Sequence, residues 1–318
     1  MISIIIPVYN NETTVASTIS WVYKQNYELS EMELIIIDDA SSDSSKSIIK
    51  RELNNSPKGL KVSCIFNDHN EGTACNYNKG IRLSSGNIVV LLHADIDLEP
   101  DSLSILVAPL KNDAEVIGSY GKCLYTKETW KKYGFWEKCL FSRHLGKNKG
   151  GIDGKFNAFR KDVLVKVGLF NSKNFYTAGE DGDMVIKLSG YGKIVATEAV
   201  MYHIHDRDVN FSLAKLIYKH KQYANAQGAL LRIHGIRSVS SFIRSFYKEL
   251  LIIGLILPYI GLISLVAILI FVFLYTWDVY LSEIKNTKVI ILPLVNFYIL
   301  VISTIYSLKG FIDGEQRI

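Results

Sequence analysis

Apolar and polar positions alternate in blocks along the first hundred residues. Short apolar runs, rich in isoleucine and valine, lie at 2–6, 34–37, 62–66 and 88–92. Continuous runs closed by polar residues are typical of strands covered on both faces. Between them, helical periodicity predicts helices at about 11–26, 44–53 and 70–83. This order predicts an α/β fold in which helices flank both faces of a mostly parallel sheet.

Each predicted strand ends in carboxylate or amide side chains. These residues are Asn10, Asp38, Asp39, Asn67, Asp68, Asp95 and Asp97. Ligands of such sheets bind beyond the carboxyl ends of the strands, so this polar edge is the predicted ligand site. The first strand is not followed by G-x-G-x-x-G, which argues against a dinucleotide-binding domain.

The end of the fourth strand carries two carboxylates at i and i+2, Asp95 and Asp97. Both can reach one hard divalent cation that keeps room for phosphate oxygens. The alternative is a solvated turn in which Asp97 or Glu99 caps the next helix. The flanking motifs decide between the two.

Two later segments also carry candidate chemistry. The loop at 146–154 is rich in glycine and lysine, and is either a surface connection or a mobile lid over an anionic substrate. Farther on, Glu180, Asp181 and Asp183 precede a predicted helix at 184–190. Acidic residues complement the positive end of a helix dipole, which accounts for one or two of the three.

The composition changes after residue 205. Residues 207–248 contain eight basic residues and one acid, with apolar positions on single helical faces. They form either a solvated helix pair or helices along an anionic bilayer surface. Two uncharged runs follow, 28 residues at 250–277 and 20 residues at 289–308. Each is long enough to span about 30 Å of hydrocarbon, so a two-helix transmembrane hairpin is predicted.

The whole-chain composition narrows the classes of function. The 318 residues are 48% hydrophobic with a net charge of +5, which is no signature of nucleic-acid binding. The four cysteines form no C-x-x-C pair and are expected to be reduced thiols of a cytosolic domain. The start of the chain lacks the basic region of a signal peptide and is better interpreted as a first strand.

Six motifs in order carry a family resemblance. They are Ser3-Ile4-Ile5-Ile6-Pro7-Val8-Tyr9-Asn10, Ile37-Asp38-Asp39-Ala40-Ser41-Ser42-Asp43, Asn70-Glu71-Gly72 with Asn78-Lys79-Gly80, Ala94-Asp95, Asn157-Ala158-Phe159-Arg160 with Val167-Gly168-Leu169-Phe170, and Gly179-Glu180-Asp181 before His203. Over about residues 1–205 the chain resembles the family 2 nucleotide-sugar glycosyltransferases, which implies a GT-A type fold.

The resemblance also implies residue roles. Donor binding falls to Pro7, Tyr9, Glu12, Asp38, Asp39, Asn78, Ala94 and Arg160. A divalent metal, Mg²⁺ or Mn²⁺, falls to Asp95, with Asp97 and His203. Asp181 matches the catalytic base and Glu180 is expected to contact the acceptor or share that role. A carboxylate can take the proton of an acceptor hydroxyl, while the metal, Arg160 and Lys155 stabilise the departing diphosphate.

Two positions depart from the family pattern. His93 stands where the family commonly has aspartate, so Asp97 is expected to supply the second carboxylate. Tyr77 stands where many relatives have arginine, which puts a phosphate contact there in doubt.

These observations predict four parts: a GT-A catalytic domain at 1–205, basic interfacial helices at 206–248, the transmembrane hairpin at 249–309 and a tail at 310–318. The basic flank predicts a multi-pass protein of the cell membrane with a cytoplasmic catalytic domain. The predicted activity is inverting, metal-dependent transfer from a nucleotide sugar, UDP-linked in preference to GDP-linked. A lipid-linked acceptor, either polyprenyl phosphate or a glycolipid precursor of an envelope glycan, is expected, and no nucleic acid. One alternative is a non-catalytic nucleotide-sugar-binding membrane scaffold. The other is a soluble nucleotidyltransferase-like enzyme, and the hydrophobic runs disfavour this second alternative.

Overall fold

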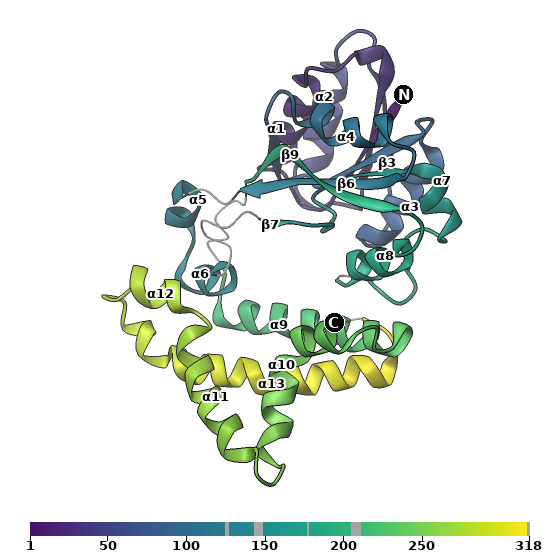
Figure 1. The fold of residues 1–318 in the computed structure, drawn as a ribbon. Coiled ribbons are helices and arrows are strands. Elements are labelled where there is room, and N and C mark those ends of the chain that lie inside the picture. Colours follow the sequence, from purple (N-terminus) through teal and green to yellow (C-terminus); the bar gives the residue numbers. More distant parts are fainter. Residues whose placement is uncertain (125–126, 143–148, 177, 205–210, 317–318) are drawn as a thin grey trace. The chain divides into compact units, whose positions relative to one another are not determined.

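The computed structural model describes residues 1–124, 127–142, 149–176, 178–204 and 211–316 (Figure 1). The chain divides into two compact units. The sheet unit comprises Met1–Thr129, Gly146–Ser172 and Glu180–Asp206, and the helical unit comprises Trp130–Leu145, Lys173–Gly179 and Arg207–Ile318. Two segments inside the predicted catalytic domain thus belong to the helical unit.

The sheet unit confirms the predicted α/β fold. Its strands have the order β3-β2-β1-β4-β8-β6-β9-β5, with β7 beside β6. The four predicted strands are β1 (Ile2–Val8), β2 (Met32–Asp38), β3 (Lys61–Phe66) and β4 (Ile88–Leu92), and they pair in parallel. Their carboxyl ends therefore meet at one edge, as expected.

The second half of the sheet is mixed. β8 (Phe156–Arg160) is antiparallel to β4 and to β6 (Val116–Leu124). β9 (Lys193–His203) is parallel to β6 and pairs antiparallel with the short β5 (Ile96–Leu98), and β7 (Lys149–Gly150) is antiparallel to β6. β9 is continuous over its 11 residues.

Helices cover both faces of this sheet, which is why its central strands are apolar at most positions. On one face, Ile4 and Ile6 pack in a core with residues of α1 (Val15–Tyr23), α2 (Ser45–Asn54) and α4 (Ser102–Asn112). On the other, Ile5 packs with residues of α3 (Thr73–Leu83), α7 (Lys161–Lys166) and α8 (Glu180–Leu188). α8 begins four residues earlier than predicted, so the acidic cluster lies in its first turn.

The helical unit is built on two long helices that lie along each other, α9 (Leu213–His234) and α13 (Leu292–Asp313). Their backbones approach closely because glycines face the partner helix. A Cβ on Gly228 would lie 1.8 Å from the Ser307 carbonyl oxygen, and one on Gly310 would lie 1.9 Å from the Asn225 carbonyl oxygen. Around them lie α5 (Lys127–Lys132), α6 (Phe135–Phe141), α10 (Val239–Leu255), α11 (Gly261–Leu274) and α12 (Trp277–Ser282).

The two predicted membrane spans have different outcomes. The second run lies in the segment Thr287–Asp313, which is the one helical stretch among the described residues that is long and apolar enough to cross a membrane. The first run is not a single helix, because α10 ends at Leu255 and α11 begins at Gly261. Proline at position 258 lacks the amide that a continuous helix needs, and Tyr259 adopts a φ of 68°. The structure therefore does not confirm a pair of transmembrane helices.

Candidate active site

Asp39 connects several segments at the carboxyl edge of the parallel strands by hydrogen bonds. Its carboxylate accepts hydrogen bonds from the amides of Glu71 (2.8 Å) and Gly72 (2.9 Å) and from Asn67 Nδ2 (2.9 Å). The Asp39 amide donates to the carbonyl of Val8 (2.8 Å). Asp39 thus fixes the start of α3 against the ends of β1 and β3, and donor binding by its carboxylate stays a prediction.

Asp38, unlike Asp39, has a carboxylate oxygen that is not engaged by the surrounding residues. Its side chain is buried, and its Oδ2 atom accepts a hydrogen bond from the Ser41 amide (3.2 Å). Its Oδ1 atom is buried without a hydrogen-bond partner among the described residues. Buried polar atoms are nearly always paired, so this oxygen is suited to accept a hydrogen bond from a bound molecule.

The predicted nucleoside-binding residues of the first loop lie at the same edge. Pro7 is half-buried near the end of β1, and Tyr9 beyond it is exposed. Glu12 also orders the loop, because its Oε2 atom accepts a hydrogen bond from the Ser44 amide (2.8 Å). Ala94 is buried after β4.

Asp95 and His203 meet across the sheet. The ladder between β5 and β9 sets His203 opposite Ile96, next to Asp95 in the chain. His203 Nε2 lies 3.0 Å from Asp95 Oδ2, and His93 Nδ1 lies 4.0 Å from Asp95 Oδ1. Burial lowers the pKa of His93 to about 4, so its imidazole is neutral at pH 7. One carboxylate is therefore flanked by two histidines.

Asp97 has a partner of its own on another element. Its Oδ1 atom accepts a hydrogen bond from Ser17 Oγ of α1 (2.7 Å). The structure thus joins Asp95 to His203 and holds Asp97 against Ser17. The expectation that Asp97 takes the place of the missing second aspartate has no support in these contacts.

A tight loop at 151–155 lies over the end of β4. The His93 amide donates to the Lys155 carbonyl (3.0 Å), and the Gly154 amide donates to Asn157 Oδ1 (2.8 Å). Lys155 Nζ forms an ion pair with Asp153 Oδ2 (2.7 Å). The predicted lid is only partly described, because residues 146–148 lie outside the described residues.

Gly154 is the residue of this loop that faces the catalytic candidate Asp181. It has a φ of 71°, and a Cβ built on it would lie 3.0 Å from Asp181 Oδ1 and 3.3 Å from His93 Nε2. Asp181 therefore lies close to the loop and to His93. The missing side chain of Gly154 keeps this space open.

The environment of Asp181 suits a base. Burial, followed by the charges of Glu180 and Asp153, raises the pKa of Asp181 well above its usual range, and Lys155 opposes this. Burial likewise raises the pKa of Glu180. Asp181 Oδ1 and Glu180 Oε2 are buried without hydrogen-bond partners among the described residues. A carboxylate with a raised pKa and an open oxygen can take a proton from a substrate near neutral pH.

Tyr77 supports the loop instead of contacting phosphate. Its side chain is fully buried in the core under α3, and its hydroxyl donates to the Gly154 carbonyl (2.8 Å). Burial raises the pKa of Tyr77 well above its ordinary value, so it stays a neutral donor. An arginine at this position would place a charge in that core.

Arg160 lies at the opposite end of β4 from Asp95. Because β8 is antiparallel to β4, Arg160 pairs with Ile88 at the start of β4, away from Asp95. Its guanidinium donates to the carbonyls of Leu110 (2.7 Å), Asp113 (3.0 Å) and Val116 (2.8 Å). Arg160 therefore joins α4 to β6 and does not reach a donor diphosphate at the carboxyl edge.

Asn78 bonds the protein's own backbone. It is buried, and its amide group bonds the backbone of Phe170 through both ends, at 2.8 and 2.9 Å. It anchors the turn after α7 to α3, and donor binding by Asn78 stays a prediction.

Asp95 and His203 are the residues that fit a divalent ion. They present one carboxylate and one imidazole in contact, a donor set that leaves coordination positions for diphosphate oxygens and water. Across the part of the chain that the structure describes, no three acidic, histidine or cysteine side chains are placed to hold an ion together. The metal is therefore a proposal that rests on Asp95 and His203.

Comparison with known proteins agrees with this arrangement. Residues 3–168, about half of the chain, match the family described as glycosyl transferase family 2. The chain belongs to this family. It is 25% identical over 166 residues to an undecaprenyl-phosphate 4-deoxy-4-formamido-L-arabinose transferase of Proteus mirabilis, covering 51% of this chain and 50% of that protein. The chain thus spans about half the length of the curated relatives it matches.

Solved structures show the same fold. The mannosyltransferase PcManGT of Pyrobaculum calidifontis, in complex with GDP-Man and Mn²⁺, superposes with a TM-score of 0.62 at 17% identity and covers 99% of this chain and 88% of that chain. A UDP-GlcNAc complex of S. aureus TarS superposes with a TM-score of 0.53 at 14% identity and covers 99% and 92%. The sheet unit is therefore GT-A-like.

The sequence did not reveal two contributors to the site. Asp153 affects Asp181 and pairs with Lys155, and Tyr77 holds Gly154. The loop sequence contains several glycines, and only the left-handed φ shows that Gly154 is the one that faces the acid.

Proposed function

We propose that the chain is an inverting glycosyltransferase that uses a nucleotide sugar, UDP-linked in preference to GDP-linked. The observation that carries the proposal is Asp181, which is half-buried, has a raised pKa and has an Oδ1 atom without a hydrogen-bond partner among the described residues. It lies beside Gly154 at the end of the sheet that also holds Asp95 and His203. Family membership supports the reaction class, and the GDP-Man and UDP-GlcNAc complexes of the structural neighbours support the donor class.

In the proposed reaction, Asp181 accepts the proton of an acceptor hydroxyl. The oxygen of that hydroxyl attacks the anomeric carbon of the donor sugar at the same time. The bond from that carbon to the diphosphate oxygen breaks, and the nucleoside diphosphate leaves with the electron pair. A single displacement of this kind inverts the anomeric configuration. Glu180, adjacent and also open at one oxygen, is positioned to bind an acceptor hydroxyl.

The leaving group carries the charge that must be stabilised. A divalent ion held by Asp95 and His203 would neutralise part of the diphosphate charge. Lys155 is the basic side chain of the loop over β4, and the charge of Asp153 raises its pKa although burial opposes this, so it stays protonated. Asp38 Oδ1 is available for a donor group of the nucleoside.

We further propose a lipid-linked acceptor, either polyprenyl phosphate or a glycolipid precursor of an envelope glycan, at the cytoplasmic face of the membrane. The support is the apolar helical unit and the undecaprenyl phosphate in the name of the Proteus mirabilis relative. The basic flank at 207–248 favours the cytoplasmic side.

The test compares the parent with Asp181→Asn in membranes supplied with a panel of nucleotide sugars and Mg²⁺ or Mn²⁺. We expect metal-dependent release of nucleoside diphosphate that Asp181→Asn reduces by about 10²-fold or more, with donor binding unchanged. Asp162→Asn is the matched control, because it makes the same change in the first turn of α7 at an exposed site. Donor binding without turnover in the parent would favour the non-catalytic scaffold.

A further inference from the structure

The apolar run at 250–277 folds back on itself as a helical hairpin of α10 and α11. α11 has 14 residues and therefore rises only about 21 Å, at 1.5 Å per residue. The hydrocarbon core of a bilayer is about 30 Å thick. α11 is thus too short to cross a bilayer.

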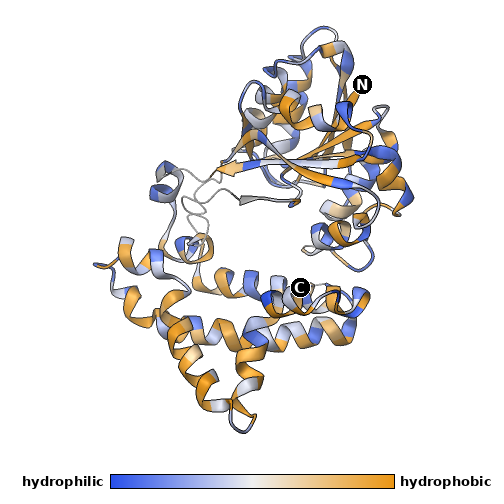
Figure 2. Ribbon diagram, in the orientation of Figure 1, coloured by the Kyte–Doolittle hydropathy of each residue, from blue (hydrophilic) through white to orange (hydrophobic). Residues whose placement is uncertain are grey.

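The tip of the hairpin exposes apolar side chains. Ile256 is 82% exposed, Tyr259 100% and Leu262 73%. Figure 1 shows α10 and α11 projecting from the layer of α9 and α13, and in Figure 2 this projection is strongly hydrophobic. An exposed apolar projection of this kind marks a contact with another apolar phase.

Backbone amides and carbonyls at the turn of the hairpin are hydrogen-bonded to each other, as a water-free environment requires. The amide of Leu257 donates to the Gly254 carbonyl and that of Gly261 to the Leu257 carbonyl, both at 3.2 Å. Gly254 also lets the two helices approach, because a Cβ there would lie 2.1 Å from Ser264 Oγ. Paired backbone groups and small residues at the contact are what helices in hydrocarbon require.

The close contact with α9 argues against a transmembrane α13. α9 lies along α13, and it carries Lys219, Lys221 and Asn225 in its middle. If α13 crossed the bilayer, these groups would enter the hydrocarbon core, where charged side chains are costly. A position of the pair along the membrane surface avoids that penalty.

α13 has the surface pattern of an interfacial helix. Leu294, Tyr298, Ile305, Leu308 and Ile312 recur at helical spacing and are 46–72% exposed. The opposite face is buried, with Ser303 and Gly310. One apolar stripe on an otherwise packed helix fits a helix that lies in the headgroup region with that stripe toward the acyl chains.

The segment after the hairpin returns to α6. Glu283 forms an ion pair with Lys138, and the Lys288 ammonium lies 5.9 Å from the Phe135 ring. Phe135 of α6 is six residue steps from Thr129 of the sheet unit, which reach at most about 22 Å. This is less than the thickness of the hydrocarbon core, so the 278–288 loop lies on the same side of the membrane as the sheet unit.

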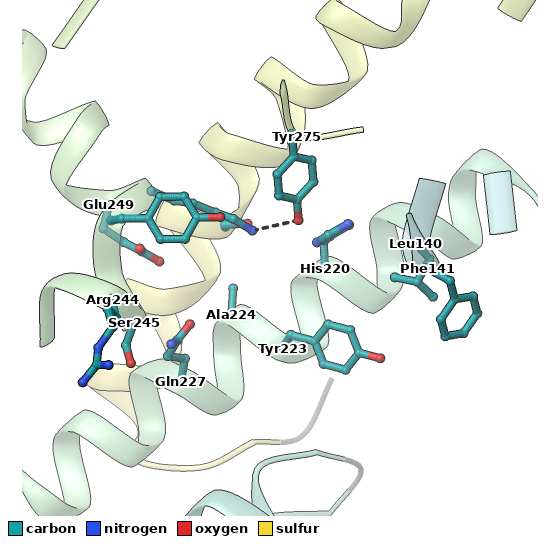
Figure 3. A pocket seen from close by; sticks show the side chains of 13 residues that line it. Leu140, Phe141, His220, Tyr223, Ala224, Gln227, Arg244, Ser245, Glu249 and Tyr275 are labelled. Carbon is teal, nitrogen blue, oxygen red and sulfur yellow. Dashed lines mark hydrogen bonds between the residues drawn. The ribbon is translucent and has the colours of Figure 1, made fainter. Parts of the chain in front are cut away.

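Cations mark the base of the hairpin. A cavity of about 330 Å³ there is lined by the cations Arg244 and Lys248 of α10, together with His220 of α9 and the acid Glu249 (Figure 3). The Lys248 ammonium donates to the Tyr275 hydroxyl (3.3 Å). Basic groups directly before the apolar hairpin complement the phosphates of anionic lipids at headgroup depth.

We infer that the helical unit inserts the α10–α11 hairpin into a single leaflet of an anionic phospholipid bilayer and crosses no bilayer with α10, α11 or α13. This inference rests on the proposed membrane function and replaces the multi-pass arrangement with a monotopic one. The sheet unit, the 278–288 loop and the end of α13 then share one side of the membrane.

The decisive experiment is thiol labelling of the full chain with a membrane-impermeant maleimide in cells and in inverted vesicles. Lys285→Cys tests the loop, and Asn54→Cys at the exposed end of α2 is the reference on the sheet unit. The unsubstituted chain gives the background of its four free thiols. We expect both added cysteines to be labelled from the same side. Labelling of Lys285→Cys from the opposite side, or from neither side, overturns the inference.

A second measurement tests the hairpin itself. The purified chain is floated with vesicles of phosphatidylglycerol and phosphatidylethanolamine, and Ile256→Asp is compared with Leu83→Asp, an equally apolar residue that is 56% exposed on α3. We expect the bound fraction to fall at least fivefold for Ile256→Asp alone, with nucleoside diphosphate binding unchanged in both. Equal flotation of both variants contradicts the inference. Absence of sugar transfer in the parent chain and in all of these variants would count against the proposed function. It would leave the labelling pattern unaffected.

Discussion

Replacement of Gly154 by alanine separates strain in the backbone from damage to the site. Gly154 has a φ of 71°, where a residue with a Cβ costs about 1–2 kcal/mol. The new Cβ would also lie 3.0 Å from Asp181 Oδ1, which forces the carboxylate or the loop to move. Because misplacement of a catalytic group by about 1 Å can reduce the rate about 10²-fold, we expect kcat to fall at least about tenfold.

Gly168→Ala is the matched control. Gly168 has a φ of 85°, and a Cβ there meets no atom within 4 Å. The same backbone penalty of about 1–2 kcal/mol is therefore expected without any effect on the site. Urea unfolding would measure stability, and release of nucleoside diphosphate would measure activity.

The two variants make the reasoning refutable. We expect Gly154→Ala to lose at least as much unfolding free energy as Gly168→Ala, and we expect kcat to fall only in Gly154→Ala. Full activity of a destabilised Gly154→Ala would show that the space beside Asp181 is not needed. An equal loss of activity in Gly168→Ala would show that the effect comes from instability.

Two further predictions concern Arg160 and Glu33. Arg160→Gln should lower the free energy of unfolding by about 1.5–3 kcal/mol because three carbonyls lose a charged donor, with the KM for the donor unchanged; a raised KM at unchanged stability would restore the donor-binding role. Glu33, held by Ser3, Ser85 and Lys61, has a pKa lowered to about 2 by these hydrogen bonds although burial opposes them. Its folded-state pKa lies below its ordinary 4.5, so its contribution, at most about 3 kcal/mol, is complete above that pH and is lost as the pH falls toward 2. Acid unfolding of Glu33→Gln should therefore converge with that of the parent at low pH, and a constant difference would contradict this.

The sequence alone determined the catalytic half of the molecule in outline. Strands covered on both faces are apolar at most positions, so β1, β2 and β4 could be located from their composition. Parallel connection then brings their polar ends to one edge, which predicts that Asp39 and Asp95 share that edge. The acidic pair Glu180 and Asp181 was also visible in the sequence. Three acidic residues lie together before a predicted helix, and the helix dipole accounts for only one or two of them.

Only the tertiary structure decided which of the polar side chains bond the protein's own backbone. Asn78 and Arg160 are polar in the sequence, but the antiparallel return of β8 and the turn after α7 direct both to backbone groups. Likewise, an uncharged run of 28 residues satisfies the length of a membrane span, and only the break at Pro258 and the ion pair of Glu283 with Lys138 show that it folds back. Composition records what a segment can bury, whereas the partner that it buries against is set by contacts between residues far apart in the chain.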